Sequence, residues 1–147
     1  MILLVEDDPR EVELTLRPLR DLNPGSCVEV ARDGEEALDF LLGRGEFRRR
    51  QTAPLPHLVL LDLQLPRVDG LGVLRAVRGN ARTCMVPVVV LTSSNDPRQL
   101  AQCYQLGANS CVLRPVRYQE FSDTIQSVAR YWLGFNQPPP PSTQPLA

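Results

Sequence analysis

The sequence predicts a doubly wound α/β fold, in which five parallel strands alternate with five helices. Two observations predict this class. Five short segments are almost wholly apolar, which is typical of parallel strands covered by helices on both faces. The longer segments between them carry apolar side chains at helical spacing, and such alternation favours a parallel sheet. The expected strands are residues 2–5, 27–31, 58–61, 86–91 and 110–113.

The expected helices have their own start signals. Asp8 is placed to cap a helix that begins at Pro9, because proline is tolerated in the first turn and aspartate accepts from its free N–H groups. This helix should run to about Leu22, and Pro18 is expected to kink or shorten it. The later helices are expected over residues 34–42, from 70 to about 78, from 97 onward, and from 118 to about 133.

Two stretches interrupt this alternation. Residues 44–56 hold an arginine run and two prolines, which predicts a long polar loop. Residues 137–147 are rich in proline, which is typical of a disordered segment. We therefore expect one ordered domain over residues 1–134 and a proline-rich disordered tail over residues 135–147.

The composition excludes several kinds of chemistry. All 16 basic side chains are arginine and 17 side chains are acidic, so the net charge is −1 and no polyanionic partner is indicated. Without lysine, the chain has neither a Schiff-base nucleophile nor the lysine of a phosphate-binding loop. His57 is the only histidine, which excludes metal sites built from histidine pairs.

Cysteine spacing and hydropathy set expectations about location. The four cysteines are widely spaced with no CxxC pair, which favours free thiols in a reducing compartment. No apolar run approaches the roughly 20 residues that a membrane span needs. The apolar segment at the start of the chain ends before Glu6, so it is shorter than the apolar stretch of a secretion signal. We expect a cytoplasmic protein with no membrane partner.

Polar side chains follow four of the five expected strands. Glu6 and Asp7 follow the first strand, Asp62 the third, Thr92 the fourth and Arg114 the fifth. In a sheet of order 2-1-3-4-5, the carboxyl ends of these strands are neighbours, and ligands bind at that edge. Clustered carboxylates repel one another and need a compensating cation, and their hard oxygen atoms suit Mg²⁺. A hydroxyl and a guanidinium beside that metal could bind the oxygens of a phosphoryl group. A carboxylate is itself a plausible acceptor of that group.

These motifs resemble the receiver domains of two-component response regulators. The matching residues are Glu6 and Asp7, the segment Asp-Leu-Gln-Leu-Pro-Arg-Val-Asp-Gly that begins at Asp62, then Thr92, and Arg114 followed by proline. The spacings of 30 residues from Asp62 to Thr92 and 22 from Thr92 to Arg114 fit that family. The resemblance implies a flavodoxin-like receiver fold with strand order 2-1-3-4-5. It also implies a signalling protein rather than an enzyme that turns over a substrate.

One subgroup of the family is indicated. The insertion at 44–56 and the ending Arg-Tyr-Trp-Leu-Gly-Phe-Asn at 130–136, followed by prolines, resemble the single-domain regulators that accompany bacterial and cyanobacterial phytochromes. This resemblance implies that a histidine kinase, a phytochrome, donates the phosphoryl group. It implies output through protein–protein contacts and no DNA partner.

The resemblance implies a role for each site residue. Asp62 is the phosphoacceptor. Asp7, Asp62 and the backbone carbonyl of Gln64 bind Mg²⁺, and Glu6 binds it through water. Thr92 bonds a phosphoryl oxygen and moves with it.

Two positions depart from the family pattern. Arg114 stands where the family has lysine, and it could face the phosphate, pair with the acid cluster, or do both. Cys111 stands where the family usually has an aromatic switch residue. These departures leave open an alternative function, in which the chain is a degenerate receiver that dimerises and binds partners without phosphorylation.

Two further functions are possible for this fold class. An aspartyl phosphatase usually carries a second aspartate two residues after the nucleophile, where this chain has Gln64. A flavin-binding domain would place the flavin phosphate beside the acid cluster, which repels it. The sequence favours neither.

Apolar side chains near the end of the chain predict a homodimer. A single apolar stripe covers the core face of the last helix, so the remaining aromatic side chains form a second apolar surface. The family commonly dimerises through its fourth helix, fifth strand and fifth helix. The implied interface includes Cys103, Tyr104, Cys111, Tyr131, Trp132 and Phe135. The alternative is that the tail folds back over these aromatic side chains.

Overall fold

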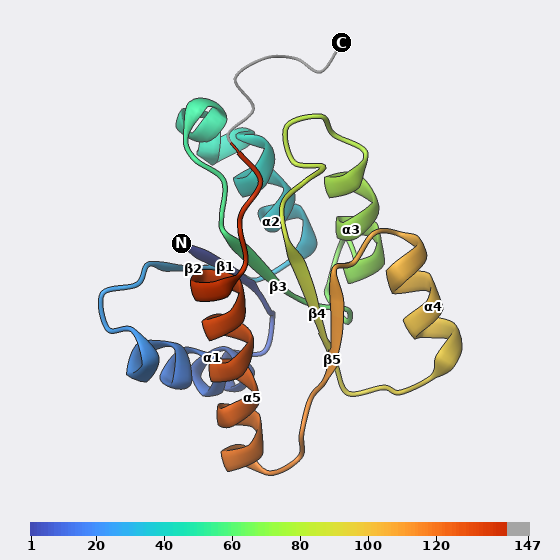
Figure 1. The fold of residues 1–147 in the computed structure, drawn as a ribbon. Coiled ribbons are helices and arrows are strands. Elements are labelled where there is room, and N and C mark those ends of the chain that lie inside the picture. The colour runs from blue at the N-terminus through green and yellow to red at the C-terminus, as the bar shows by residue number, and fades with distance from the viewer. Residues whose placement is uncertain (141–147) are drawn as a thin grey trace.

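A computed structural model describes residues 1–140 and shows a parallel sheet between two layers of helices (Figure 1). The strand order is β2-β1-β3-β4-β5, which confirms the predicted fold class and order. The strands are β1 (Ile2–Val5), β2 (Val28–Ala31), β3 (Leu58–Asp62), β4 (Val88–Thr92) and β5 (Ser110–Leu113). Since all pairs are parallel, the carboxyl ends of β1, β3 and β4 lie at one edge of the sheet.

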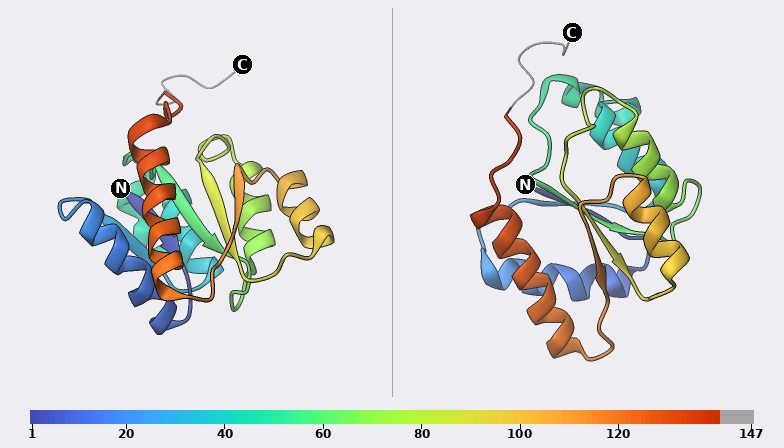
Figure 2. Two further views of the ribbon diagram at one scale, coloured as in Figure 1. Left: turned by 60° about the horizontal axis from the view of Figure 1, so that its bottom comes forward. Right: turned by 45° about the vertical axis from the view of Figure 1, so that its right-hand side comes forward.

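Helices cover both faces of the sheet (Figure 2). They are α1 (Pro9–Leu22), α2 (Gly34–Leu42), α3 (Gly70–Arg78), α4 (Pro97–Gln105) and α5 (Tyr118–Arg130). Ile2 and Leu4 of β1 pack with α1 and α5 on one face. Leu3 and Val5 pack with α2, α3 and α4 on the other. Because alternate side chains of a strand point to opposite faces and both faces are buried, β1 is apolar throughout.

Aspartate caps four of the five helices. Each of these carboxylates accepts a hydrogen bond from a backbone N–H in the first turn, which contributes about 1 kcal/mol per helix. The capping residues are Asp8, Asp33, Asp69 and Asp96. The cap at Asp8 confirms the predicted start of α1 directly after the acidic segment.

The long polar loop predicted over residues 44–56 is wrong in part, because η1 (Gly45–Thr52) is a 3-10 helix. The Phe47 ring meets the Phe40 ring of α2 edge-on, with centroids 5.4 Å apart. Arg82 donates to the backbone carbonyl of Ala53 at 3.0 Å. These contacts order the segment, whereas one aromatic residue beside a run of arginines gives no helical periodicity in the sequence.

Some details of the helices and strands differ from prediction. α1 runs unbroken to Leu22 with Pro18 inside it, so the expected shortening is wrong. β4 begins at Val88 rather than at residue 86, because the preceding proline has no N–H for the ladder. α5 ends at Arg130, and η2 (Tyr131–Phe135) continues it as a π-helical turn.

Arg78 ties α3 to the segments on either side of β4. Its guanidinium donates to four acceptors at 2.7 to 3.0 Å, which are the backbone carbonyls of Cys84, Val86 and Gly107 and the side-chain oxygen of Asn109. This fixes how α4 and β5 lie against the centre of the sheet.

The end of the described chain has neither helix nor strand after residue 135. Pro138, Pro139 and Pro140 line a cleft together with residues 51–57 and 85–87. The rest of the predicted disordered tail, residues 141–147, lies outside the described residues, and the domain boundary after residue 134 stays a prediction. Within residues 1–140, no helix is long and apolar enough to cross a membrane.

Candidate metal and phosphoryl site

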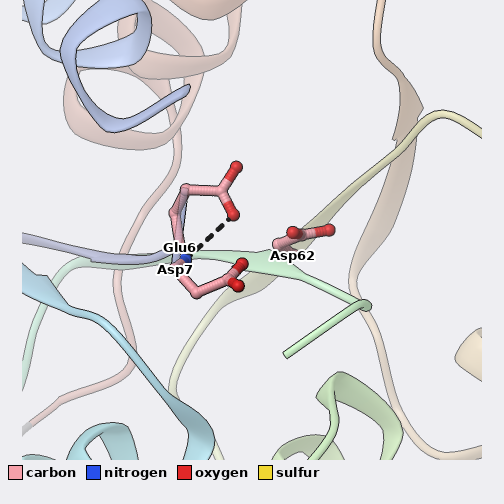
Figure 3. Close-up of side chains that lie close together, drawn as sticks. All are labelled: Glu6, Asp7 and Asp62. Carbon is pink, nitrogen blue, oxygen red and sulfur yellow. Dashed lines mark hydrogen bonds between the residues drawn. The ribbon is translucent and has the colours of Figure 1, made fainter. Parts of the chain in front are cut away.

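Three carboxylates converge at the carboxyl edge of the sheet (Figure 3). Glu6 and Asp7 follow β1, and Asp62 is the last residue of the neighbouring strand β3. The three side chains each offer an oxygen, and these oxygens lie within 4.8 Å of one another. Gln64 lies in the turn that follows, where its N–H donates to Oδ1 of Asp62 at 3.3 Å. The structure therefore brings the predicted acids together.

Gly70 allows α3 to begin directly against the end of β3. A Cβ atom at this position would lie 2.5 Å from the carbonyl oxygen of Asp62 and from Cα of Leu63. The Gly70 N–H donates to the Leu63 carbonyl at 2.9 Å, which closes the turn after the acid. The Asp-Gly pair of the sequence motif thus caps α3 and holds the loop beside Asp62.

Glu6 is the most buried of the three acids, with 3% of its surface exposed. Burial, a hydrogen bond with Asp62 and the charge of Asp62 raise the pKa of Glu6 to about 8. The charge of Arg114 and the Asp7 N–H, which donates to Oε2 of Glu6 at 3.1 Å, act in the opposite direction. Adjacent carboxylates cannot all ionise without compensation, so this cluster holds a proton or a cation.

The donor set fits a divalent metal ion. Glu6, Asp7 and Asp62 offer hard carboxylate oxygens, which Mg²⁺ and Mn²⁺ prefer. Asp7 is exposed and Asp62 is half-buried, so the cluster is open to solvent. These three residues are the ones that would hold the metal.

Thr92 stands beside this cluster at the end of β4, with 5% of its surface exposed. Its Oγ1 accepts the Ser94 N–H at 3.1 Å and donates to Oε1 of Gln99 at 3.3 Å. Gln99 belongs to α4, so in this structure the hydroxyl at the end of β4 is hydrogen-bonded to that helix.

Arg114 pairs with two acids on the α1 side of the cluster. One amino nitrogen lies 3.5 Å from Oε1 of Glu6, and the other bonds Oε2 of Glu11. The guanidinium carbon lies 5.2 Å from the centre of the Phe121 ring. Among residues 1–140 its ion pairs are with these acids and not with Asp62, which is the ion-pair role weighed for Arg114 from the sequence.

Cys111 lies in β5 opposite Val90, with its N–H donating to the Tyr104 hydroxyl at 3.2 Å. Burial chiefly, with the neighbouring Cys103, raises the pKa of the Cys111 thiol to about 11. Cys103 is fully buried between α4 and the sheet. Its expected place in a dimer interface is therefore wrong for this structure, because no part of its side chain reaches the surface.

Sequence reasoning missed Glu11 and the position of Phe121 beneath Arg114. Glu11 lies in the first turn of α1, where an acid is common because it complements the helix dipole. Phe121 fits the core stripe of α5. Neither residue carries a local signal for the site, since they meet Arg114 only once α1 and α5 pack together.

Residues 2–126 match the response regulator receiver domain family, and the chain belongs to that family. It is a receiver-domain response regulator, and phosphorylation-dependent signalling is the standard role of such proteins. The chain is 38% identical over 143 residues to the probable methanogenesis regulatory protein FilR2 of Methanothrix harundinacea, covering 97% of this chain and 89% of the relative. It is 32% identical over 133 residues to response regulator Rcp1 of Synechocystis sp., covering 90% and 88%.

Solved structures of phytochrome response regulators have the same fold. The phosphorylated cyanobacterial phytochrome response regulator RcpA superposes with a TM-score of 0.87 at 29% identity, covering 95% of this chain and 97% of that chain. The bacteriophytochrome response regulator AtBRR is 45% identical, with a TM-score of 0.72 and coverage of 92% and 96%. The Mn²⁺-bound form of Rcp1 has a TM-score of 0.82 at 32% identity, covering 95% and 98%. The predicted kinship with phytochrome response regulators is confirmed.

Proposed function

We propose that the chain accepts a phosphoryl group on Asp62 in a reaction that requires Mg²⁺. The observation that carries this proposal is the meeting of Glu6, Asp7 and Asp62 within 4.8 Å at the carboxyl edge of the sheet. An Asp62 carboxylate oxygen attacks phosphorus and forms an O–P bond. The N–P bond of the donor's phosphohistidine breaks, and its electron pair stays on the imidazole nitrogen, which takes up a proton.

The side chains around Asp62 have separate tasks in this reaction. A bound Mg²⁺ supplies positive charge beside the transferring phosphoryl oxygens. Asp7 and Glu6 hold that charge in place and keep it next to the nucleophile. The Thr92 hydroxyl lies at the neighbouring strand end, where it would bond one phosphoryl oxygen. The backbone carbonyl of Gln64 is our proposed further ligand, since its residue lies in the turn after Asp62.

The proposed donor is a histidine kinase of the phytochrome type. The 45% identity to a bacteriophytochrome response regulator and the close fit to RcpA support this partner. The chain would then act as a signalling protein that modifies only itself and acts through protein contacts, without binding DNA. A cytoplasmic location stays the expectation from the sequence.

A homodimer through α4, β5 and α5 is part of the proposal. Large apolar side chains are exposed along these elements and η2, and they are Tyr104, Leu113, Val116, Tyr118, Tyr131, Leu133 and Phe135. Trp132 is half-buried and meets the Tyr131 ring edge-on at 5.1 Å, so it supports this surface from beneath. Cys111 is half-buried in β5, and its N–H donates a hydrogen bond to the Tyr104 hydroxyl. Light scattering should give twice the chain mass at micromolar concentration, and a monomer there would contradict the dimer.

Phosphotransfer from a kinase tests the whole proposal. A bacteriophytochrome kinase is loaded with labelled phosphate, freed of ATP, and mixed with the protein and Mg²⁺. Label should pass to the wild type and not to Asp62→Asn, in which the amide is no nucleophile. Equal transfer to both proteins would place the acceptor elsewhere. No transfer to either would favour the degenerate receiver.

A further inference from the structure

The guanidinium of Arg114 is held on three sides before any phosphoryl group arrives. Glu6 and Glu11 each take one of its two amino groups, and the Phe121 ring lies beneath the plane. The side chain of Arg114 is only 14% exposed, so water has little access to these contacts. Both of its ion pairs are thus with acids of or beside α1, and neither is with Asp62, the last residue of β3.

We propose that Glu11 is a positioning residue that holds Arg114 in the unphosphorylated protein and competes with the phosphoryl group for it. This inference rests on the proposed function of Asp62. It assigns to Glu11 a part in the reaction that its place in the first turn of α1 does not require.

Charge and hydrogen-bond geometry favour such competition. A guanidinium has five N–H donors in a fixed fork, and each carboxylate or phosphoryl oxygen that it serves needs a matching direction. The Glu11 carboxylate and a phosphoryl group on Asp62 are both anions, and the fork is directed at Glu6 and Glu11 in this structure. Contact with the phosphoryl group turns the fork toward Asp62 and weakens or breaks its pair with Glu11.

Phe121 makes this exchange possible without exposing the charge. A ring beneath the guanidinium attracts it through its face and uses none of its N–H donors. The fork can therefore turn over the ring while all its donors stay available. A lysine, with a compact charge and no plane, would gain less from this ring.

The test is the affinity of the phosphoryl mimic beryllofluoride in the presence of Mg²⁺, followed by fluorine NMR. Four proteins are compared, which are the wild type, Glu11→Gln, Arg114→Met and the double variant. Glu13→Gln is the matched control, because Glu13 lies two residues further along α1 and, within residues 1–140, its ion pairs are with exposed arginines of that helix. Thermal unfolding of each variant shows that it is folded.

Glu11→Gln should bind the mimic about tenfold more tightly than the wild type, as expected when one charge-assisted competitor is removed. Glu13→Gln should bind like the wild type. In the Arg114→Met background, Glu11→Gln should change nothing, which separates an action through Arg114 from the loss of a negative charge. Glu11→Asp keeps the charge on a shorter side chain, so its affinity for the mimic should lie between those of the wild type and Glu11→Gln. This variant provides a second test if Glu11→Gln does not fold.

Each other outcome overturns the inference. Unchanged or weaker binding by Glu11→Gln would show that Glu11 does not compete. An equal gain in the Arg114→Met background would show a general charge effect. If neither the wild type nor any Glu11 variant binds the mimic, the proposed function fails and the inference fails with it. Binding by the wild type without a Glu11 effect would contradict the inference alone.

Discussion

Glu6 should make metal binding strongly dependent on pH. Its carboxyl is buried beside Asp62, and these surroundings raise its pKa to about 8 in the metal-free protein. A divalent cation and a proton then compete for the same negative charge. Metal affinity should therefore rise with pH up to about 8 and level off above it.

The size of the effect follows from the pKa. At one pH unit below the pKa, roughly ten in eleven Glu6 side chains carry the proton, so apparent Mg²⁺ affinity at pH 7 should be about tenfold below its plateau. At pH 6 it should be about 100-fold below the plateau. Binding at pH 7 should release close to one proton, because the metal displaces the proton that most molecules hold.

Titration calorimetry measures both quantities. Mg²⁺ is titrated at several values between pH 6 and pH 9, in pairs of buffers with different ionisation enthalpies that report proton release. Glu6→Gln is the control, since it cannot ionise, and its weaker affinity should be nearly flat over this range. A flat affinity in the wild type, with no proton released at pH 7, would refute the reasoning about Glu6.

Two further predictions concern residues that support the site. Gly70→Ala places a methyl group 2.5 Å from the carbonyl oxygen of Asp62. It should destabilise the fold by about 1–3 kcal/mol in urea unfolding and weaken Mg²⁺ binding. Gly134→Ala is the control and should have neither effect, because its methyl group would meet nothing within 4 Å. Arg78→Met removes the Arg78 donor from three backbone carbonyls and from Oδ1 of Asn109, which keeps the Val88 N–H. It should lower the free energy of unfolding by about 2–4 kcal/mol, while substitution of the exposed Arg75 by methionine should change it little. Equal effects in either pair would contradict these contacts.

The sequence predicts the sheet and the acid cluster well because both depend on local patterns. Apolar runs such as residues 58–61 indicate buried parallel strands, and a polar residue at the end of each run lies at the edge where the strands meet. Glu6, Asp7 and Asp62 are found in this way without any knowledge of side-chain packing.

Such local patterns do not predict contacts between elements that lie far apart in the sequence. Glu11 and Arg114 are 103 residues apart and meet only because α1 and α5 share one face of the sheet. The order of η1 depends on Phe40 and on a guanidinium from the loop after α3. From the sequence, Cys103 is expected at the interface because the family resemblance implies contacts through its helix, and the sequence of this short helix does not show which side faces the sheet.

Arg114 stands where the family has lysine, and this replacement has a physical explanation in the structure. A lysine offers one point charge, whereas the arginine fork pairs with Glu6 and Glu11 at the same time. The ring of Phe121 supports its planar group. The position thus keeps a positive charge near the acids, and its partners explain why the larger side chain is accommodated.

The central claim is that Asp62 accepts a phosphoryl group with the help of the acids around it. The most direct measurement is intact mass after treatment with a small-molecule phosphodonor and Mg²⁺, compared with a sample in which a chelator removes the metal. The account predicts one phosphoryl adduct on the wild type with Mg²⁺, none with the chelator, and none on Asp62→Asn. An adduct on the folded Asp62→Asn protein, or no adduct on the folded wild type with Mg²⁺ present, would contradict the claim.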